Sequence, residues 1–312
     1  MTRTLSLFAR LAAWTAAIAM FALMAVASAQ QSFKTPEDAV AALAGAAKDD
    51  WPKGVVIVLG AEGADIVSSG DAVADESNRQ KFLAAYDAQH RISREGEDKA
   101  EMIIGTQDYP FPIPLVHKEG GWQFDTAAGR LEILYRRVGR NELDAIQSCL
   151  AYVDAQNEYA EKDPMGTGAT TYAQHIVSRP GKKDGLYWPT AAGEQASPLG
   201  ELVARATAQG YGIGGGRTPF HGYYYKVLTK QGSSAPGGAM DYVVRGKMIG
   251  GFALVAWPAE YGNSGVMTFL VDHSGVVFQK DLGPETAAVA QSMSSFNPDS
   301  TWEKADTTTA AR

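Results

Sequence analysis

Asp108, His117 and Asp125 are the residues whose types and spacing come closest to those of a hydrolytic site. A histidine beside a carboxylate can act as a general base, because it can take a proton from water or from a nucleophile. All three residues belong to neighbouring strand-like pieces of the chain. Their register is undetermined, since a shift of one residue reverses which side chains face a pocket. A hydrolase that uses an Asp/His pair is therefore one hypothesis for this chain.

Other patterns associated with catalysis or metal binding are incomplete. The glycine-rich stretch 210–216 lacks the order of a phosphate-binding loop, and Ser264 lacks the strand and helix that flank a nucleophile elbow. The segment 163–168 has too few oxygen ligands for a calcium loop. The histidines are scattered, without an H-E-x-x-H motif or a cysteine partner. The sequence thus predicts neither a cofactor nor a metal.

Positive charge gathers on one predicted helix of an acidic chain. Arg136 and Arg140 are four residues apart, so a helix places them on one face, where both could bind an anion. The competing interpretation is that they pair with Glu132, Glu142 and Asp144. The sequence leaves both interpretations open.

Aromatic residues with polar tips occur in the loop 184–189 and in the strand-like run 221–225. Such residues are common in recognition surfaces and carbohydrate platforms. Strand alternation sends Tyr223 and Tyr225 to one face and Tyr224 to the other. We therefore expect Trp188 and Tyr224 to form an exposed binding patch.

Cys149 is the only cysteine, so the chain cannot form an internal disulfide. It lies on the apolar stripe of a predicted helix, beside Ile146, Leu150 and Val153. A free cysteine in such a position behaves as a small hydrophobic residue. We predict a packed thiol rather than a nucleophile.

The N-terminal segment has the pattern of a secretory signal. Arg3 and Arg10 precede an uncharged run over 11–26, and small residues follow at 27–29. The run is shorter than the ~20 residues that span a bilayer, and no cysteine follows it for lipid attachment. We expect cleavage after Ala29, no membrane span afterwards, and a soluble periplasmic or secreted protein.

Composition narrows the choice of partner. The chain has 28 Lys and Arg against 35 Asp and Glu, a formal net charge of −7. A negative protein does not attract phosphate backbones. We expect no nucleic acid partner, and instead an envelope protein, a polymer or a small ligand.

The periodicity predicts an α+β fold in two domains. In the first domain, 33–138, helices are predicted at 35–47 and 76–90, a buried strand or helix at 54–60, and strands at 101–105, 113–117 and 122–125. In the second, 139–304, helices are predicted at 140–160, 172–176, 198–207 and 284–293, and strands at 223–228, 241–244, 252–257, 266–271 and 276–279. Residues 305–312 have no core-forming side chains and are predicted to be disordered.

Four long runs carry a family resemblance: 111–116, 121–130, 139–146 and 247–258. They resemble the DUF2950 family of exported bacterial proteins, and this resemblance extends over nearly the whole chain after residue 29. Membership implies a location in the cell envelope and no established activity.

Two further resemblances concern the domains. The first domain resembles the NTF2-like or cystatin-like fold, in which a curved antiparallel sheet wraps around helices. The second, a long helix followed by an antiparallel sheet, resembles the globular heads of type II secretion pseudopilins. Pilins begin with an apolar helix that builds the fibre, whereas the helix here follows a whole domain. Fold does not decide function. A non-catalytic envelope binding module is therefore our first hypothesis, with the hydrolase and a pilus- or secretion-associated accessory protein as alternatives.

Overall fold

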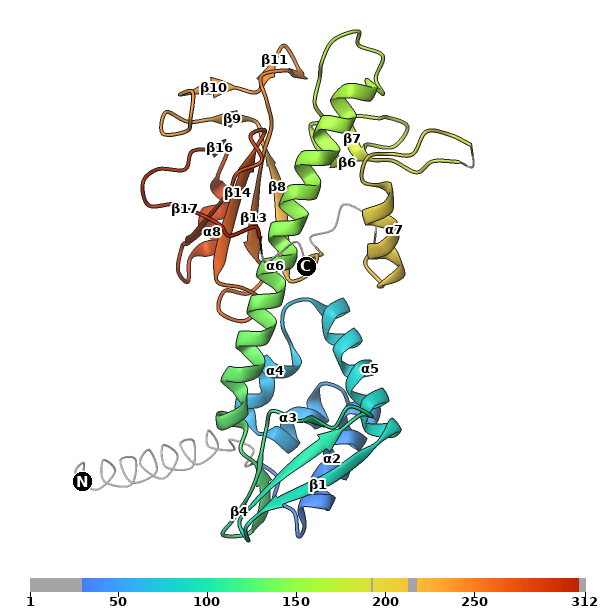
Figure 1. Cartoon of the computed structure of the whole chain (residues 1–312), viewed down its shortest axis with the longest axis vertical. Helices are drawn as coiled ribbons and strands as arrows, with labels where there is room; N and C mark the ends of the chain where they lie inside the picture. Colours follow the sequence, from blue (N-terminus) through green and yellow to red (C-terminus); the bar gives the residue numbers. More distant parts are fainter. Residues whose placement is uncertain (1–29, 192, 213–217, 309–312) are drawn as a thin grey trace, which may run out of the picture. The chain divides into compact units, whose positions relative to one another are not determined.

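The computed structural model describes residues 30–191, 193–212 and 218–308 (Figure 1). Its contacts divide the chain into two compact units. Within the described residues, the first unit contains 30–67 and Phe82–Arg130, and the second contains Ser68–Lys81 and 131–308. The sequence had suggested a boundary between 138 and 139 and no excursion at 68–81. The expected cleavage site after Ala29 lies outside the described residues.

Short helices open the first unit. They are α2 (Pro36–Asp49), α3 (Lys53–Leu59), η1 (Ala61–Gly63) and α4 (Ala64–Val67), and the end of α5 (Ala72–Ala88) also belongs here. Thr35 caps α2, because its hydroxyl accepts a hydrogen bond from the Asp38 N–H. The segment 54–60, which the sequence left as strand or helix, is helical. Val55, Val58 and Leu59 are buried, so α3 belongs to the core.

An antiparallel sheet completes the first unit. Its strands are β1 (His90–Glu95), β2 (Lys99–Ile104), β3 (Tyr109–Pro110), β4 (Leu115–Lys118) and β5 (Gly121–Phe124). They run in the order β1-β2-β4-β5, and β3 pairs with β2. The three predicted strands are present, whereas β1 was missed. Its sequence is polar and mostly exposed, so it has no alternating apolar pattern to identify it.

One long helix, α6 (Thr126–Lys162), joins the two units, and its first five residues belong to the first of them. It begins 14 residues before the predicted start at 140. The glycines at 129 and 139 weakened the helical signal without interrupting the helix. Asp163, with φ of 39°, follows its end. Both Asp163 carboxylate oxygens accept hydrogen bonds from Thr167 and Gly168, so this loop is closed by its own backbone.

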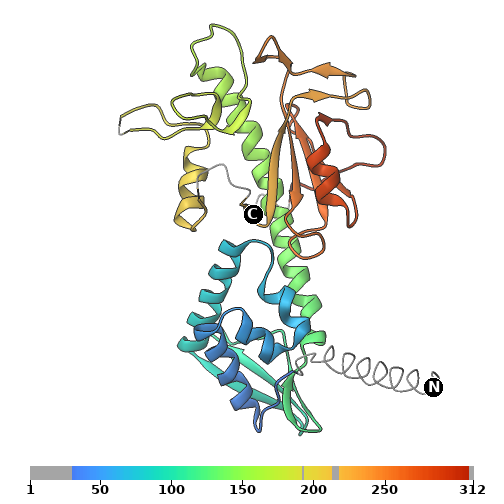
Figure 2. The same ribbon diagram turned by 180° about the vertical axis from the view of Figure 1, so that it is seen from behind.

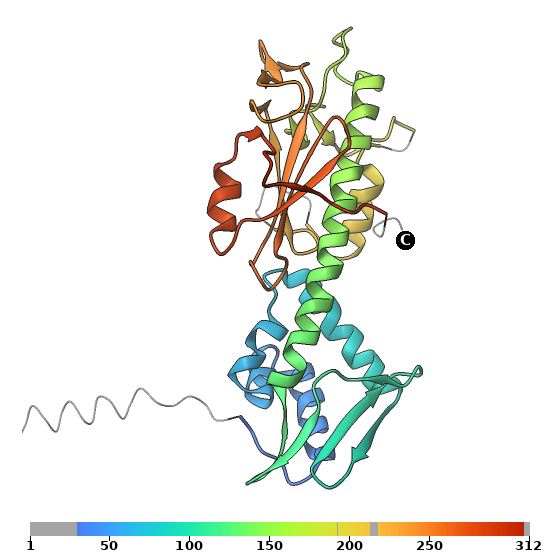
Figure 3. The same ribbon diagram turned by 60° about the vertical axis from the view of Figure 1, so that its left-hand side comes forward.

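The second unit is built on a sheet in the order β17-β15-β14-β13-β8. These strands are β8 (Tyr223–Leu228), β13 (Ala253–Pro258), β14 (Met267–Asp272), β15 (Val277–Asp281) and β17 (Glu303–Lys304). Every residue of β13 is buried, because α6 and α8 (Thr286–Ser292) cover opposite faces of the sheet (Figure 3). The strands at 223–228, 252–257, 266–271 and 276–279 were predicted within one or two residues. These strands could be predicted because they are rich in β-branched and aromatic residues and are flanked by turn residues.

Smaller elements surround this sheet. They are β6 (His175–Val177), β7 (Gly185–Tyr187), α7 (Gly200–Ala208), β9 (Lys230–Gln231), β10 (Met240–Asp241), β11 (Val243–Val244), β12 (Lys247–Met248) and β16 (Ser295–Phe296). The predicted helix at 172–176 is wrong: β6 there pairs in parallel with β7. Of the predicted tail 305–312, Ala305 donates its N–H to the Val277 carbonyl oxygen, and 309–312 lie outside the described residues. The chain is a mixed α+β protein, and none of its described helices is long and apolar enough to cross a membrane.

Cys149 lies in the core of the second unit with 0% exposure. Burial raises the pKa of its thiol to about 12, so almost no thiolate forms near neutral pH. We expect iodoacetamide to leave Cys149 unmodified in the native protein under conditions that fully label the urea-unfolded chain. Mass spectrometry of both samples measures this, and equal labelling would contradict the packed position.

Candidate binding site

A pocket of about 760 Å³ lies beside strand β8 in the second unit. We call it the β8 pocket. Its walls come from α6, α7, β6, β8 and β13, together with Gln291 of α8 and the residues on either side of 213–217. Figure 2 shows α7, in yellow, beside α6. The volume lies within the range of ~300–1,000 Å³ that is typical of small-ligand sites.

Strand alternation places β8 side chains on both sides of the pocket. Tyr225 faces α6, where Ser148 and Tyr152 also line the pocket. Tyr224 and Lys226 point to the opposite face, where Lys226 reaches the end of α8. The pocket therefore extends around the outer edge of the sheet.

Helix α7 supplies an apolar wall. Leu202, Val203 and Ala206 line the pocket, and their spacing of three and four residues puts them on one face of the helix. Leu199, just before the helix, donates its N–H to the Leu186 carbonyl oxygen and is 7% exposed. The anchored N-terminus holds this apolar face in place.

Asp71 fixes the rim of the pocket. It is 1% exposed, and its Oδ2 accepts hydrogen bonds from the Tyr211 hydroxyl and the Gly222 N–H, both at 2.9 Å. Its Oδ1 accepts from Val73 and Ala74, which caps the start of α5. Burial and the Asp71 carboxylate raise the pKa of Tyr211, so its phenol remains a donor. Tyr211 lines the pocket, and Gly222 precedes β8.

A histidine lies just outside the lining. His221 has a left-handed backbone, with φ of 52°. Its Nδ1 is 2.9 Å from Asp144 Oδ2, and its Nε2 is 3.2 Å from Gln209 Oε1. Because both ring nitrogens have partners, this pair ties α6 to the turn before β8. No sequence pattern indicates this pair, because the two residues are 77 positions apart.

The described residues of the pocket lining offer almost no free charge. Lys226 is the one charged residue among the described lining residues, and its Nζ donates to the carbonyl oxygens of Gln291 and Met293, both at 2.6 Å. Burial raises the pKa of Tyr225, which keeps its phenol neutral. The Trp257 indole N–H is buried and has no hydrogen-bond partner among the described residues. The chemistry of the lining is apolar and aromatic, with a few neutral polar groups.

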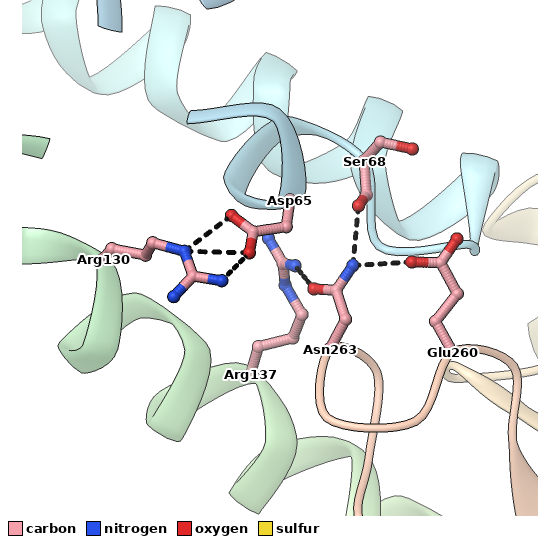
Figure 4. A network of polar contacts seen from close by, with 6 residues as sticks. All are labelled: Asp65, Ser68, Arg130, Arg137, Glu260 and Asn263. Atoms are coloured by element: carbon pink, nitrogen blue, oxygen red, sulfur yellow. Dashed lines mark hydrogen bonds and ion pairs between the residues drawn. The ribbon is translucent and has the colours of Figure 1, made fainter. Parts of the chain in front are cut away.

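A polar network holds the segment 68–81 in the second unit (Figure 4). Arg137, 7% exposed, donates to Asn263 Oδ1. Asn263 Nδ2 donates to the Ser68 carbonyl oxygen at 2.8 Å and to Glu260 Oε2 at 2.7 Å. The first unit has its own pair, in which Arg130 donates to both carboxylate oxygens of Asp65. Asn263 thus holds the segment from which Asp71 reaches Tyr211, at the pocket rim, and Gly222.

The comparison with known protein families concerns almost the whole chain. The model of a family described as "Protein of unknown function (DUF2950)" matches residues 30–305. The chain belongs to the DUF2950 family. No curated protein and no solved structure matches it. The predicted membership is therefore confirmed, and the resemblances to NTF2-like domains and pseudopilin heads stay predictions.

The predicted aromatic patch of the DUF2950 protein does not form. Trp188 is 6% exposed and packs edge-on against Tyr159, so it is part of the core. Tyr224 is half-buried, lines the β8 pocket and lies 5.8 Å from Trp257, centroid to centroid. The loop 184–189 looked like a surface loop because of its glycine and proline, but β7 inside it packs inward. Tyr224 remains a candidate binding residue, in a pocket rather than on a flat patch.

The ion-pair interpretation of the two arginines holds for Arg136 and Glu132, but not for Glu142 or Asp144. Arg136 binds Glu132 one turn earlier at 2.6 Å, and Arg140 is exposed. Glu142 instead accepts hydrogen bonds from the N–H groups of Val266 and Met267. Asp144 pairs with His221. An anion site at Arg136 and Arg140 stays an untested prediction.

The three residues of the hydrolase hypothesis are not brought together. His117 has Asp98 as its acidic neighbour, at 3.7 Å. Asp108 pairs with Arg91, and Asp125 accepts from the Ala128 N–H near the start of α6. The hydrogen bonds and ion pairs of the described residues include none between His117 and either aspartate. The register therefore separates these side chains.

Proposed function

We propose that this DUF2950 protein is an exported, non-catalytic binding module that holds a neutral, largely apolar ligand in the β8 pocket. The observation that carries the proposal is the lining itself. Apolar residues of α7 and tyrosines of β8 line the same pocket, and the only charged lining residue among those described already has two partners. Export is supported by the apolar run 11–26 and the small residues that follow it.

Filling the pocket provides the test. We expect the neutral fluorescent probe N-phenyl-1-naphthylamine to bind the protein, and Ala206→Trp to weaken that binding at least about tenfold, because the indole occupies the space beside α7. Ala204→Trp is the matched control, since Ala204 is exposed on another face of the same helix. Fluorescence titration measures all three proteins.

Two outcomes would contradict the proposal. The first is the absence of probe binding by the wild-type protein. The second is equal affinity of the wild type and Ala206→Trp while circular dichroism reports an unchanged fold.

A further inference from the structure

We infer that the natural ligand of the β8 pocket is an extended, uncharged stretch of polypeptide that adds to the sheet as a strand beside β8. This inference rests on the proposed function and specifies its ligand. Four features lead to it: the open edge of β8, the limits of that edge, the lining on both sides of it, and the charge of the lining.

The edge of β8 is open at the pocket. In the sheet of the second unit, β8 is the last strand and pairs only with β13 among the described residues. The Gly222 carbonyl oxygen accepts from the Ala259 N–H on the β13 side, whereas Tyr223 exchanges both backbone hydrogen bonds with Phe220 on the other side. Antiparallel pairing alternates along a strand. The N–H and C=O groups of Tyr225 and Val227 therefore point away from β13, toward the open edge.

Backbone hydrogen bonds occupy the residues on either side of this open stretch of β8. Phe220 occupies the backbone groups of Tyr223, and beyond the strand the Thr229 carbonyl oxygen accepts the Tyr242 N–H. Only Tyr225 and Val227 remain between them, offering two donors and two acceptors. A short strand of a few residues would satisfy all four. Exposed edges normally carry charges or proline against such pairing. The one charge on β8, Lys226, is held by the Gln291 and Met293 carbonyl oxygens, and β8 contains no proline.

The pocket matches the side chains of an added strand. Residues of a strand alternate between the two faces of a sheet. The lining likewise lies on both sides of the β8 edge, with Tyr152 and Tyr225 toward α6 and Tyr224 and Trp257 on the opposite face. A strand in this position would place alternate side chains against these aromatic rings. This mode of recognition combines backbone hydrogen bonds for affinity with pockets for specificity.

Charge decides between a peptide and a lipid-like ligand. An anionic lipid held with its headgroup inside the pocket would need a cation there. Lys226 is the only cation among the described lining residues, and its Nζ donates to two carbonyl oxygens. A blocked or internal peptide segment without charged side chains needs no counterion. The described part of the lining therefore favours polypeptide over an anionic lipid.

The test uses the blocked peptide acetyl-Thr-Phe-Thr-Val-Thr-Val-amide and two derivatives with N-methyl groups on alternate residues. Strand addition uses every second N–H, so one derivative should lose binding at least about tenfold and the other should keep it. Displacement of N-phenyl-1-naphthylamine from the wild-type protein measures the three affinities.

A protein variant provides an independent arm. Val227→Pro removes one open-edge N–H and leaves the ladder with β13 intact, because proline is tolerated at such edge positions. We expect it to bind the peptide at least about tenfold more weakly and the probe unchanged, while Val227→Thr keeps both affinities. If Val227→Pro does not fold, the affinities of the two methylated peptides for the wild-type protein still test strand addition.

The outcomes separate the two proposals. Probe binding without peptide binding, or equal affinities of the two methylated peptides, would overturn strand addition and leave the binding pocket in place. Absence of both probe and peptide binding would overturn the proposed function as well.

Discussion

Asp71→Ala should lower the free energy of unfolding by about 3–5 kcal/mol. The buried carboxylate accepts four hydrogen bonds, from Val73, Ala74, Tyr211 and Gly222. Without it, α5 loses its cap and two buried donors lose their acceptor. Urea unfolding followed by circular dichroism measures the change, and hydrogen exchange should show reduced protection of the Gly222 amide.

Asp87→Ala provides the control for this prediction. Asp87 lies on the same helix and is exposed, so its replacement should change stability by no more than about 0.5 kcal/mol. Asp71→Asn should fall between the two, because its amide oxygen can keep the helix cap while its amide nitrogen faces the Gly222 N–H. A loss below about 1 kcal/mol for Asp71→Ala would contradict the anchoring role. Binding of N-phenyl-1-naphthylamine should weaken along with stability, since Tyr211 lines the pocket.

Gly129→Ala and Gly139→Ala should have opposite effects although both lie in α6. A β-carbon on residue 129 would come within 2.5 Å of the Pro112 carbonyl oxygen and 2.6 Å of the Ile113 Cα. Backbone atoms cannot move aside cheaply, so we expect a loss of about 2–3 kcal/mol even though alanine favours helix. A β-carbon on residue 139 meets nothing within 4 Å. There we expect a gain of about 0.5–1 kcal/mol.

Thermal unfolding of the two variants beside the wild type provides the measurement. A midpoint that rises for Gly129→Ala would contradict the close approach of α6 to residues 112–113. A midpoint that falls for Gly139→Ala would contradict the exposed position of that glycine.

The sequence predicted elements whose pattern is local. β-branched and aromatic residues between turn residues identified β8, β13, β14 and β15, and Thr35 with Pro36 identified the start of α2. It failed where distant contacts decide. Polar β1 is a strand because β2 pairs along its whole length, and 172–177 is not helical because His175–Val177 pairs with β7.

The candidate site was less predictable than the fold. Tyr224 was predicted as a binding residue because it is an aromatic residue with a polar tip, and it does line the pocket. Trp188 was predicted on the same grounds and is buried. Asp71 could have been found locally, since an aspartate before a helix is a cap signal. Its two further partners are 140 and 151 residues away, and no sequence pattern reports such distances.

The segment Ser68–Lys81 has a consequence for how this gene can be divided. The second unit is encoded in two pieces that are separated by coding sequence for the first unit. A reading frame that starts at residue 131 would omit Asp71 and the Ser68 carbonyl, and would therefore encode a pocket whose rim residue Tyr211 lacks its acceptor. Recombination could exchange the first unit only by splicing at three junctions, so the two units should be inherited together.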